Sequence, residues 1–392
     1  GGRLSKGSER AAAVMEHLSA QRDEMVEMLL ALSRLESPTD VVASQAAVQR
    51  QLTDALEELG FGVSHRRGHE TGGFLFAKAR TRVRGRPAQL LIGHCDTVWP
   101  LGTTQSMPVV HEDGIVRGPG TFDMKAGLVQ GIFALRALRD LGHEPPLTPV
   151  WFINSDEETG SPESQRYVAL VARHVDRTFV LEPSLGPAGD LKTARKGVGR
   201  YVVTVNGKAA HSGLDPTGGA SAIQELSHVI QRLHALTDHE RGLTVNVGVI
   251  HGGTRANVIA AAAEAVVDVR IMTVADGKWI DGIIRGLEAT VPGTSISVSG
   301  GVEVPPLERT PRNRALWHAA QGAAERLGIP LGEQISGGGS DGNTTSQFTA
   351  TLDGLGAVGD GAHARHEHVV AARMPERAAL VAELLMTPGD EA

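Results

Sequence analysis

Apolar residues recur at helical spacing through the first sixty residues of the chain, in two segments. Segment 11–37 repeats them every three or four positions, and segment 39–60 opens on the capping pair Thr39-Asp40 and closes at Gly60. This periodicity, together with the capping signals, predicts two helices.

From residue 74 onward, short and nearly continuous apolar runs alternate with amphipathic segments. Runs of this kind, without a polar face, are typical of strands in a sheet that helices cover on both sides. The predicted strands are 74–79, 88–94, 148–154 and 177–183, and the predicted helices are 125–142, 162–174 and, late in the chain, 311–328. The alternation indicates an α/β domain.

The pattern changes near residue 197, where longer strands with polar positions at every second residue begin. Strand, helix, two strands, helix and strand follow one another up to about residue 300, which is the element order of a ferredoxin-like α+β unit. Long helices then return. We therefore expect an α/β fold of two domains, with a mixed α/β domain formed by 1–196 and 309–392. An inserted ferredoxin-like domain would span 197–308.

Length and composition agree with this division and exclude several classes of protein. At 392 residues the chain exceeds what one hydrophobic core usually supports. No apolar run approaches the roughly 18–20 residues of a membrane-spanning helix. The net charge of −7, with Lys and Arg scattered along the chain, predicts no nucleic-acid surface. The single cysteine, Cys95, and the lack of an apolar leader near the N-terminus predict a cytoplasmic protein.

Polar residues of one chemical kind follow the predicted strands. His94 and Asp96 end one strand, Asp156, Glu157 and Glu158 follow another, and Glu182 follows a third, while Asp123 directly precedes a helix. A single acid at such a place is usually a helix cap or a loop residue. In open α/β sheets, however, ligands bind beyond the carboxyl ends of the strands, so these side chains are expected to converge on one crevice.

Imidazole with several carboxylates is a ligand set typical of zinc. A site for two metal ions needs a bridging carboxylate and further ligands on each ion. A late segment offers three more imidazoles, His363, His366 and His368. Outside such a site, this segment would be interpreted as a histidine cluster on a surface loop.

Six segments match one known family in its own order. They are LIGHCDTVWP, GPGTFDMKAGL, NSDEETGS, LEPS, KAAHSGLDPTGGASAI and GGTRANVIAAAAEAVVDVR. The sequence thus resembles the M20 family of co-catalytic zinc metallopeptidases, and within it the glutamate carboxypeptidase branch. The resemblance runs from about residue 12 to the end of the chain.

The resemblance implies a metal ligand set. His94 and Glu182 would bind one zinc ion, and Asp123, which a cis peptide bond follows in the family, would bridge both ions. Glu158 and a late histidine would bind the second ion. From the family's spacing to the C-terminal helix we expect this histidine to be His366, with His363 as the competitor. Cobalt or manganese could replace zinc.

The resemblance also implies two catalytic roles near the metals. Asp96 would orient the His94 imidazole without ligating a metal. Glu157 would act as general base on a water between the two ions and then return the proton to the leaving amine. Adjacent side chains on an extended segment point in opposite directions, so Glu157 and Glu158 are expected to have different functions. Asp156 is expected to be a loop or capping residue.

The resemblance implies that 1–196 and 309–392 form the catalytic dizinc domain and that 197–308 is a lid or dimerisation domain. This inserted domain would supply the rest of the site. His211, in AAHSG, matches a histidine that stabilises the tetrahedral oxyanion and that comes from the partner subunit in dimeric members. Asn257 and Arg270 match positions that contact substrate; for Arg270 the alternative is a structural salt bridge. Gly338 and Ser340, in the glycine-rich stretch 336–343, would lie over the carboxylate end of the substrate.

These expectations describe a hydrolase that acts on a small peptide or an N-acyl amino acid. The leading hypothesis is a dizinc carboxypeptidase that cleaves a C-terminal amino acid such as glutamate, in a homodimer formed through the inserted domain. An alternative is an aminoacylase or deacylase of the N-acetylornithine or N-succinyl-diaminopimelate type, because such enzymes share the metal ligands. Less favoured alternatives are a catalytically silent peptide-binding member and a non-metal α/β binding protein.

Overall fold

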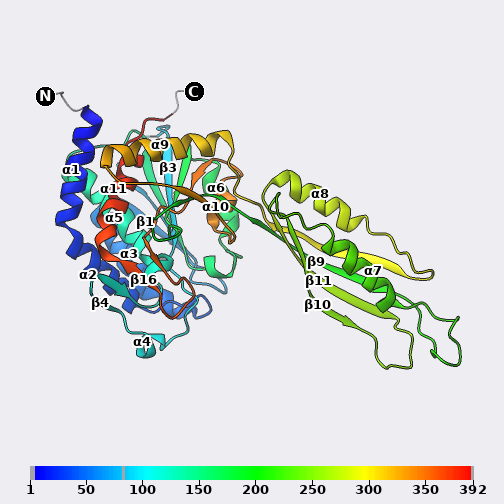
Figure 1. Cartoon of the computed structure of the whole chain (residues 1–392). Helices are drawn as coiled ribbons and strands as arrows, with labels where there is room; N and C mark the ends of the chain where they lie inside the picture. Colours follow the sequence, from blue (N-terminus) through cyan, green and yellow to red (C-terminus); the bar gives the residue numbers. More distant parts are fainter. Residues whose placement is uncertain (1–4, 82–83, 390–392) are drawn as a thin grey trace. The chain divides into compact units, whose positions relative to one another are not determined.

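The structure is a computed structural model that describes residues 5–81 and 84–389 (Figure 1). The first four and last three residues, which belong to the predicted catalytic domain, lie outside the described residues. The chain divides into two compact units. The first contains the segments up to Thr193, Arg309–Ser336 and Ser340 onward, and the second contains Ala194–Glu308 with Gly337–Gly339. The second unit thus begins three residues before the predicted boundary.

A six-stranded mixed sheet forms the centre of the first unit, in the order β1-β2-β6-β3-β7-β14. Strands β3, β6, β7 and β14 are parallel, and β1 and β2 join antiparallel at one edge. The strands are β1 (Phe61–Arg66), β2 (Phe74–Ala79), β3 (Ala88–His94), β6 (Thr148–Asn154), β7 (Arg177–Val180) and β14 (Ala350–Leu352). The carboxyl ends of β3, β6 and β7 therefore meet at one edge.

Helices lie on both faces of this sheet (Figure 1). They are α1 (Lys6–Ala20), α2 (Arg22–Arg34), α3 (Gln45–Glu58), α5 (Ala126–Asp140), α6 (Gln165–Ala172), α9 (Pro311–Leu327), α10 (Asp341–Thr345) and α11 (Met374–Leu385), with a short α4 (Thr103–Ser106). Along β3, Leu91 packs into one buried cluster with α5 and α11, while Leu90 and Ile92 pack into the other with Val168 of α6. Burial on both faces explains the continuous apolar runs and confirms the predicted α/β fold.

The N-terminal segment differs from its prediction in two places. The helix predicted over 11–37 is two helices, α1 and α2, which meet at Gln21. The segment that was expected to start a helix at Thr39 instead forms a 3₁₀ turn, Val42–Ser44, before α3 begins. Buried positions continue across Gln21 at helical spacing, so hydrophobic periodicity gives no sign of the break.

Several short strands were not predicted. A four-stranded sheet of order β15-β16-β5-β4 lies within the first unit, and a two-stranded sheet joins β13 and β8. The strands are β4 (Val110–Glu112), β5 (Ile115–Arg117), β8 (Leu191–Arg195), β13 (Glu333–Ser336), β15 (Gly359–Asp360) and β16 (His368–Val370). Strands of two to five residues are too short for a period of two to be recognised.

The second unit is a four-stranded antiparallel sheet, β10-β11-β9-β12, with two helices. Its elements follow the predicted order: β9 (Gly197–Asn206), α7 (Ala222–His234), β10 (Thr244–Gly252), β11 (Ala262–Ile271), α8 (Val274–Arg285) and β12 (Ser295–Val304). Alternate residues of β9 and β11, such as Tyr201 and Val267, form its core with α7 and α8. This is the ferredoxin-like topology.

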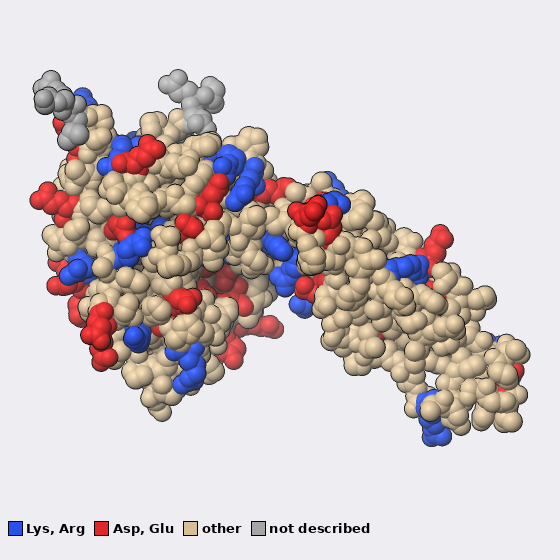
Figure 2. Space-filling view, in the orientation of Figure 1, with Lys and Arg blue, Asp and Glu red and all other residues tan. Residues whose placement is uncertain are grey.

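Charged side chains of both signs are interspersed on the face of the molecule in Figure 2. Among the residues that the structure describes, no helix combines the length and the apolar character needed to cross a membrane.

Candidate metal centre

The predicted strand-end residues do converge. His94 is the last residue of β3, Glu157 and Glu158 lie in the turn after β6, and Glu182 follows β7 by two residues. Asp123 comes from a different element, the irregular turn Thr121–Lys125 that leads into α5. The peptide bond between Asp123 and Met124 is cis, as the family resemblance implied.

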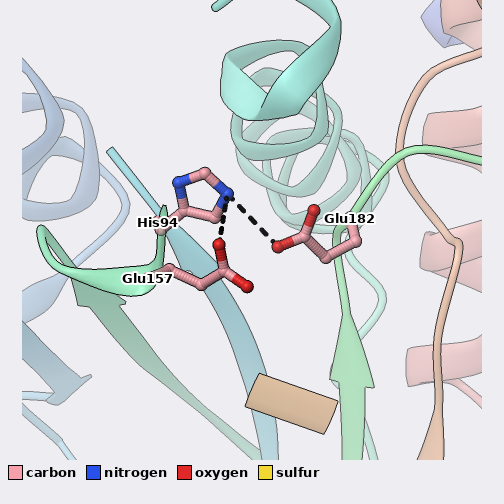
Figure 3. A group of neighbouring side chains, drawn as sticks. All are labelled: His94, Glu157 and Glu182. Atoms are coloured by element: carbon pink, nitrogen blue, oxygen red, sulfur yellow. Dashed lines mark ion pairs between the residues drawn. The ribbon is translucent and has the colours of Figure 1, made fainter. Parts of the chain in front are cut away.

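The His94 imidazole lies at the centre of one group of carboxylates (Figure 3). Its Nε2 is 3.2 Å from Oε1 of Glu182, 3.2 Å from Oδ1 of Asp123 and 3.6 Å from Oε2 of Glu157. The His94 side chain is fully buried, and those of Glu157 and Glu182 are only 14% and 10% exposed. One nitrogen and several oxygens therefore face one small volume. The ligand atoms are close enough to hold an ion in two groups of three residues that share His94: one group adds Glu157 and Glu182, and the other adds Asp123 and Glu158.

Asp123 faces a different imidazole with each of its two oxygens. Oδ1 is 3.2 Å from Nε2 of His94, whereas Oδ2 is 3.0 Å from Nε2 of His363. Nε2 of His363 also lies 3.1 Å from Oε2 of Glu158. A carboxylate between two imidazoles, each accompanied by a further glutamate, has the arrangement of a bridging ligand between two ions.

The late histidine in this group is His363, and the expectation that His366 would lie here is corrected. Nε2 of His366 instead lies 3.3 Å from Oδ2 of Asp360, and its side chain is 65% exposed. The reason is the fold of the loop. Gly361 O accepts a hydrogen bond from Ala364 N, and His363 has a left-handed backbone with φ of 61°. This conformation is uncommon for a residue other than glycine, and the family's spacing to the C-terminal helix does not anticipate it. His368 lies in β16.

The centre carries more negative charge than the described protein side chains neutralise. Burial, and next the neighbouring Glu182, raises the pKa of Glu157 well above its usual value, and burial raises that of Glu158 to about 7. Burial opposes charge on His94, but Glu182 and Glu157 outweigh it and raise the imidazole pKa. Hydrogen bonds to Asp123 and Glu158 raise the pKa of His363 to about 10.

The described residues fit bound cations. Oε1 of Glu158 is buried and has no hydrogen-bond partner among them. The nearby Lys125 is turned away, since its Nζ donates to the carbonyl oxygens of Leu32 and Leu35. Burying several carboxylates together is costly unless cations or protons accompany them. Nitrogen and oxygen ligands of this kind suit zinc and similar divalent metals.

Asp96 contacts the His94 imidazole and the backbone of Glu158. His94 Nδ1 is 3.0 Å from the carbonyl oxygen of Asp96 and 3.3 Å from its Oδ1. Oδ2 of Asp96 accepts hydrogen bonds from Thr39 Oγ1 at 2.6 Å and from the backbone N of Glu158 at 3.2 Å. Asp96 thus sets the orientation of the imidazole and also fixes the start of the Glu158 turn.

Asp156 is a capping residue, as expected from its place in the acidic run. Its Oδ2 accepts the backbone N–H groups of Glu163 and Ser164 at 2.9 and 3.0 Å, and its Oδ1 accepts Ser164 Oγ at 2.6 Å. These bonds close the turn that carries Glu157 and Glu158 onto the start of α6.

The Cys95 thiol is buried and its pKa is raised to about 12, first by burial, so it packs rather than reacts.

The predicted residues of the second unit lie in two places. His211 and Asn257 are neighbours, because Ser212 N donates to Asn257 O at 3.0 Å and His211 pairs with Val258. Arg270, on β11, lies with its Nε 2.9 Å from Oδ2 of Asp268 on the same strand. The salt bridge considered from the sequence is therefore present.

The glycine-rich stretch separates its two predicted residues. The carbonyl oxygen of Gly338 accepts Arg195 Nη1 at 3.1 Å, within the second unit. Ser340 belongs to the first unit and caps α10, with its Oγ donating to Asp353 Oδ2 at 2.6 Å and accepting Gly342 N at 3.0 Å. Because Ser340 is only 7% exposed and its hydroxyl is engaged in this cap, the structure supports a structural function for Ser340.

Two buried acids were missed. Glu367 accepts the N–H groups of Trp99, Gly120 and Asp123. Asp341 accepts Ser161 Oγ at 2.6 Å and Asn154 Nδ2 at 2.8 Å, behind the Glu157 turn. Glu367 could have been noticed from its position four residues after His363 in a segment already singled out. Asp341 directly follows Ser340, and nothing in its local sequence indicates its partners.

A model of Peptidase family M20/M25/M40 matches residues 90–387. The chain belongs to this family. Members are metal-dependent hydrolases, and the resemblance noted in the sequence is confirmed.

Two relatives of the chain have different named activities. The chain is 27% identical to carboxypeptidase G2 of Pseudomonas sp. (strain RS-16) over 379 residues, which cover 94% of this chain and 90% of that enzyme. It is 31% identical to acetylornithine deacetylase of Proteus mirabilis (strain HI4320) over 268 residues, or 63% of this chain and 66% of that enzyme.

Solved structures share the fold along nearly the whole chain. Aminopeptidase PepT of Bacillus cereus superposes with a TM-score of 0.77 at 22% identity, covering 93% of this chain and 98% of that one. The YXEP protein of Bacillus subtilis, described as a dinuclear metal binding peptidase of family M20, has a TM-score of 0.70 at 16% identity, covering 94% and 98%.

The choice between the two late histidines predicts opposite results for two alanine variants. His363→Ala should lose about one metal ion per chain, because His363 is the imidazole that faces Asp123 and Glu158. His366→Ala should keep the wild-type metal content, because His366 faces Asp360 at the surface. Elemental analysis after zinc loading and removal of free metal measures both. Metal loss in His366→Ala with full content in His363→Ala would reverse the assignment.

Proposed function

We propose that this member of the family is a dizinc amidohydrolase that releases a C-terminal amino acid, such as glutamate, from a peptidyl or N-acyl substrate. The observation that carries the proposal is the placement of Asp123 between two imidazoles. Its oxygens lie 3.2 Å from His94 Nε2 and 3.0 Å from His363 Nε2, and each imidazole has a glutamate of its own, Glu182 or Glu158.

The proposed ligands divide into two sets. His94 and Glu182 would hold one ion, His363 and Glu158 would hold the other, and Asp123 would serve both. Bound metal ions would polarise the scissile carbonyl and lower the pKa of a water molecule at the site. The zinc assignment follows from the mixture of imidazole and carboxylate ligands, which cobalt or manganese would also accept.

Glu157 is the proposed general base. It follows directly on the capping residue Asp156, and its carboxylate reaches the His94 side of the centre, 3.6 Å from Nε2. No hydrogen-bond donor to its carboxylate is found among the described residues beyond this imidazole contact, and burial raises its pKa. A carboxylate in this environment binds a proton readily, so it can take one from water and deliver it to the leaving amine nitrogen.

His211 is the proposed donor to the oxyanion that forms when the carbonyl is attacked. Its Nδ1 lies 3.1 Å from the backbone N atoms of both Gly213 and Leu214, which donate to it. Accepting these bonds leaves Nδ1 without a proton, so the neutral ring carries its proton on Nε2. The side chain is exposed and can donate from Nε2 to a substrate oxygen.

Substrate carboxylate binding is assigned to Arg270, with Asn257 beside His211 as a further contact. The Arg270 side chain is part-buried and forms an ion pair with Asp268 on the same strand. A substrate carboxylate would therefore compete with the Asp268 carboxylate for the guanidinium, and the Asp268 side chain is itself 40% exposed. The guanidinium offers two parallel N–H groups, which match a carboxylate better than an ammonium does. Gly338 remains a proposed backbone contact in this region.

A second candidate function is a deacylase that acts on N-acetylornithine or a similar N-acyl amino acid. The 31% identity to an acetylornithine deacetylase favours it, whereas the likeness to carboxypeptidase G2 extends over more of the chain. Both reactions use the same metal ligands and base.

We also propose that the chain forms a homodimer through its second unit. Strand β12 is an edge strand of the four-stranded sheet, and its Val302 is 38% exposed. An uncovered sheet edge offers backbone groups for pairing with a second copy.

Light scattering should give a mass near twice 41.3 kDa, and a monomeric mass at micromolar concentration would contradict the dimer.

Replacing Glu157 with Gln should lower kcat by about 10²–10⁴-fold, because the amide cannot accept the proton from water. Zinc content should stay at the wild-type value, because Glu157 is not among the proposed ligands. Steady-state kinetics and metal analysis of the same preparation measure the two effects. A large loss of zinc together with activity would instead make Glu157 a ligand.

The substrate class is tested by a panel of α- and γ-glutamyl conjugates, other peptides with free C-termini and N-acyl amino acids. We expect glutamyl conjugates to show the highest kcat/KM, with the free amino acid identified as product and with activity abolished by a chelator and restored by zinc. Preference for acetylornithine-like substrates by orders of magnitude would establish the deacylase. Activity that survives treatment with the chelator would contradict a metal-dependent reaction.

A further inference from the structure

Glu367 is a buried acid that no step of the proposed reaction uses. It is 1% exposed and lies four residues after His363, just before β16. All the hydrogen-bond partners of its carboxylate among the described residues are donors. Oε2 accepts Trp99 Nε1 at 2.7 Å and Gly120 N at 3.0 Å, and Oε1 accepts Asp123 N at 3.1 Å.

The backbone of Glu367 adds two more bonds within the same region. Its carbonyl oxygen accepts Gly118 N at 3.3 Å, and its N–H donates to Ala364 O at 3.0 Å. The first bond continues the pairing of β16 with β5 toward the turn that holds Asp123. The second closes the loop that places His363.

Through these contacts one side chain joins three segments that each carry a proposed metal ligand. Trp99 belongs to the loop that follows His94, Gly120 and Asp123 belong to the turn before α5, and Glu367 itself ends the loop of His363. None of these segments is a long regular element at the point of contact. Their relative positions therefore depend on such cross-links rather than on strand pairing alone.

We propose that Glu367 is a positioning residue that holds the His94, Asp123 and His363 segments in the arrangement that binds the two metal ions. The inference rests on the proposed dimetal function. It assigns to Glu367 no contact with metal or substrate; its effect passes through the backbone of Asp123 and the loop of His363. Groups that orient metal ligands in this way typically contribute about 10–100-fold to metal affinity.

The chemistry of the contacts requires a carboxylate. Three N–H donors face the two oxygens, and an amide of the same shape has only one acceptor and adds two donors. With its NH₂ at the Oε2 position, Gln would oppose both Trp99 and Gly120. The other orientation keeps those two bonds but places the NH₂ against the backbone N–H of Asp123. This second orientation costs less, and in it the hydrogen bond that holds the Asp123 backbone is lost.

Glu367→Gln is therefore the informative variant, and Glu383→Gln is its matched control. Glu383 is also fully buried, in α11, and its carboxylate accepts N–H groups of Arg10 and Arg326. Both substitutions replace one buried carboxyl group with an amide of nearly the same shape. Only the first touches segments that carry proposed ligands.

The measurements are zinc affinity, by competition with a chromophoric chelator, and the thermal unfolding midpoint of the metal-free protein. Wild type should bind about two zinc ions per chain. Glu367→Gln should bind zinc about 10–100-fold more weakly. Glu383→Gln should lower the unfolding midpoint at least as much and keep wild-type zinc affinity. Equal zinc affinity in Glu367→Gln and wild type, or equal weakening in both variants, would overturn the positioning role.

If Glu367→Gln does not fold, Trp99→Phe decides the question, because Phe keeps a six-membered aromatic ring at this position and lacks the indole Nε1–H that donates to Oε2. Weaker zinc binding supports the proposal, and unchanged binding overturns it. If wild type does not bind zinc, the proposed function itself is contradicted. If wild type binds zinc and the variants bind it equally well, only this inference fails, so the two failures are distinguishable.

Discussion

Asp123 lies with one oxygen toward His94 and the other toward His363, and this double contact constrains the structure around it. The two imidazoles come from distant parts of the chain, the end of β3 and a loop just before β16. Carboxylates gather around them because β3, β6 and β7 end at one edge of the sheet. Close packing of negative charge opposes folding unless cations or protons accompany it. This charge distribution suits bound cations, and the groups around the centre hold its side chains in place.

The acids near the centre form two groups that differ in their hydrogen bonding. Asp156 and Glu367 accept three N–H or O–H groups each, and Asp96 accepts two at one oxygen. Glu157 and Glu182 have imidazole contacts but no such donors among the described residues, and one oxygen of Glu158 has no partner. Acids with donors fix the backbone. Acids without such donors can bind a cation or a proton. By this criterion, among the three adjacent acids, Asp156 belongs to the first group and Glu157 and Glu158 belong to the second.

The fold could be predicted where one physical signal dominates. Burial on both faces makes β3 and β6 continuously apolar, and the half-buried strands β9 and β11 alternate. The signal fails where the structure depends on contacts distant in sequence. Nothing local marks the break at Gln21, and the strands of the small β15-β16-β5-β4 sheet contain two or three residues each. The capping of α10 was readable, since Ser340 and Asn343 have capping-box spacing, but the family resemblance suggested a substrate contact instead.

The late histidine shows why family spacing did not identify the second imidazole of the site. His363 and His366 lie in one short loop, and both are compatible with the family spacing when no backbone conformation is known. The choice depends on φ of 61° at His363, which turns this imidazole toward Asp123 and leaves His366 beside Asp360. A left-handed conformation at a residue other than glycine persists only when its surroundings enforce it. Here the hydrogen bonds from Ala364 N to Gly361 O and from Glu367 N to Ala364 O enclose the residue. The position of the second imidazole is therefore a property of the folded loop and of Glu367, the acid that ends it.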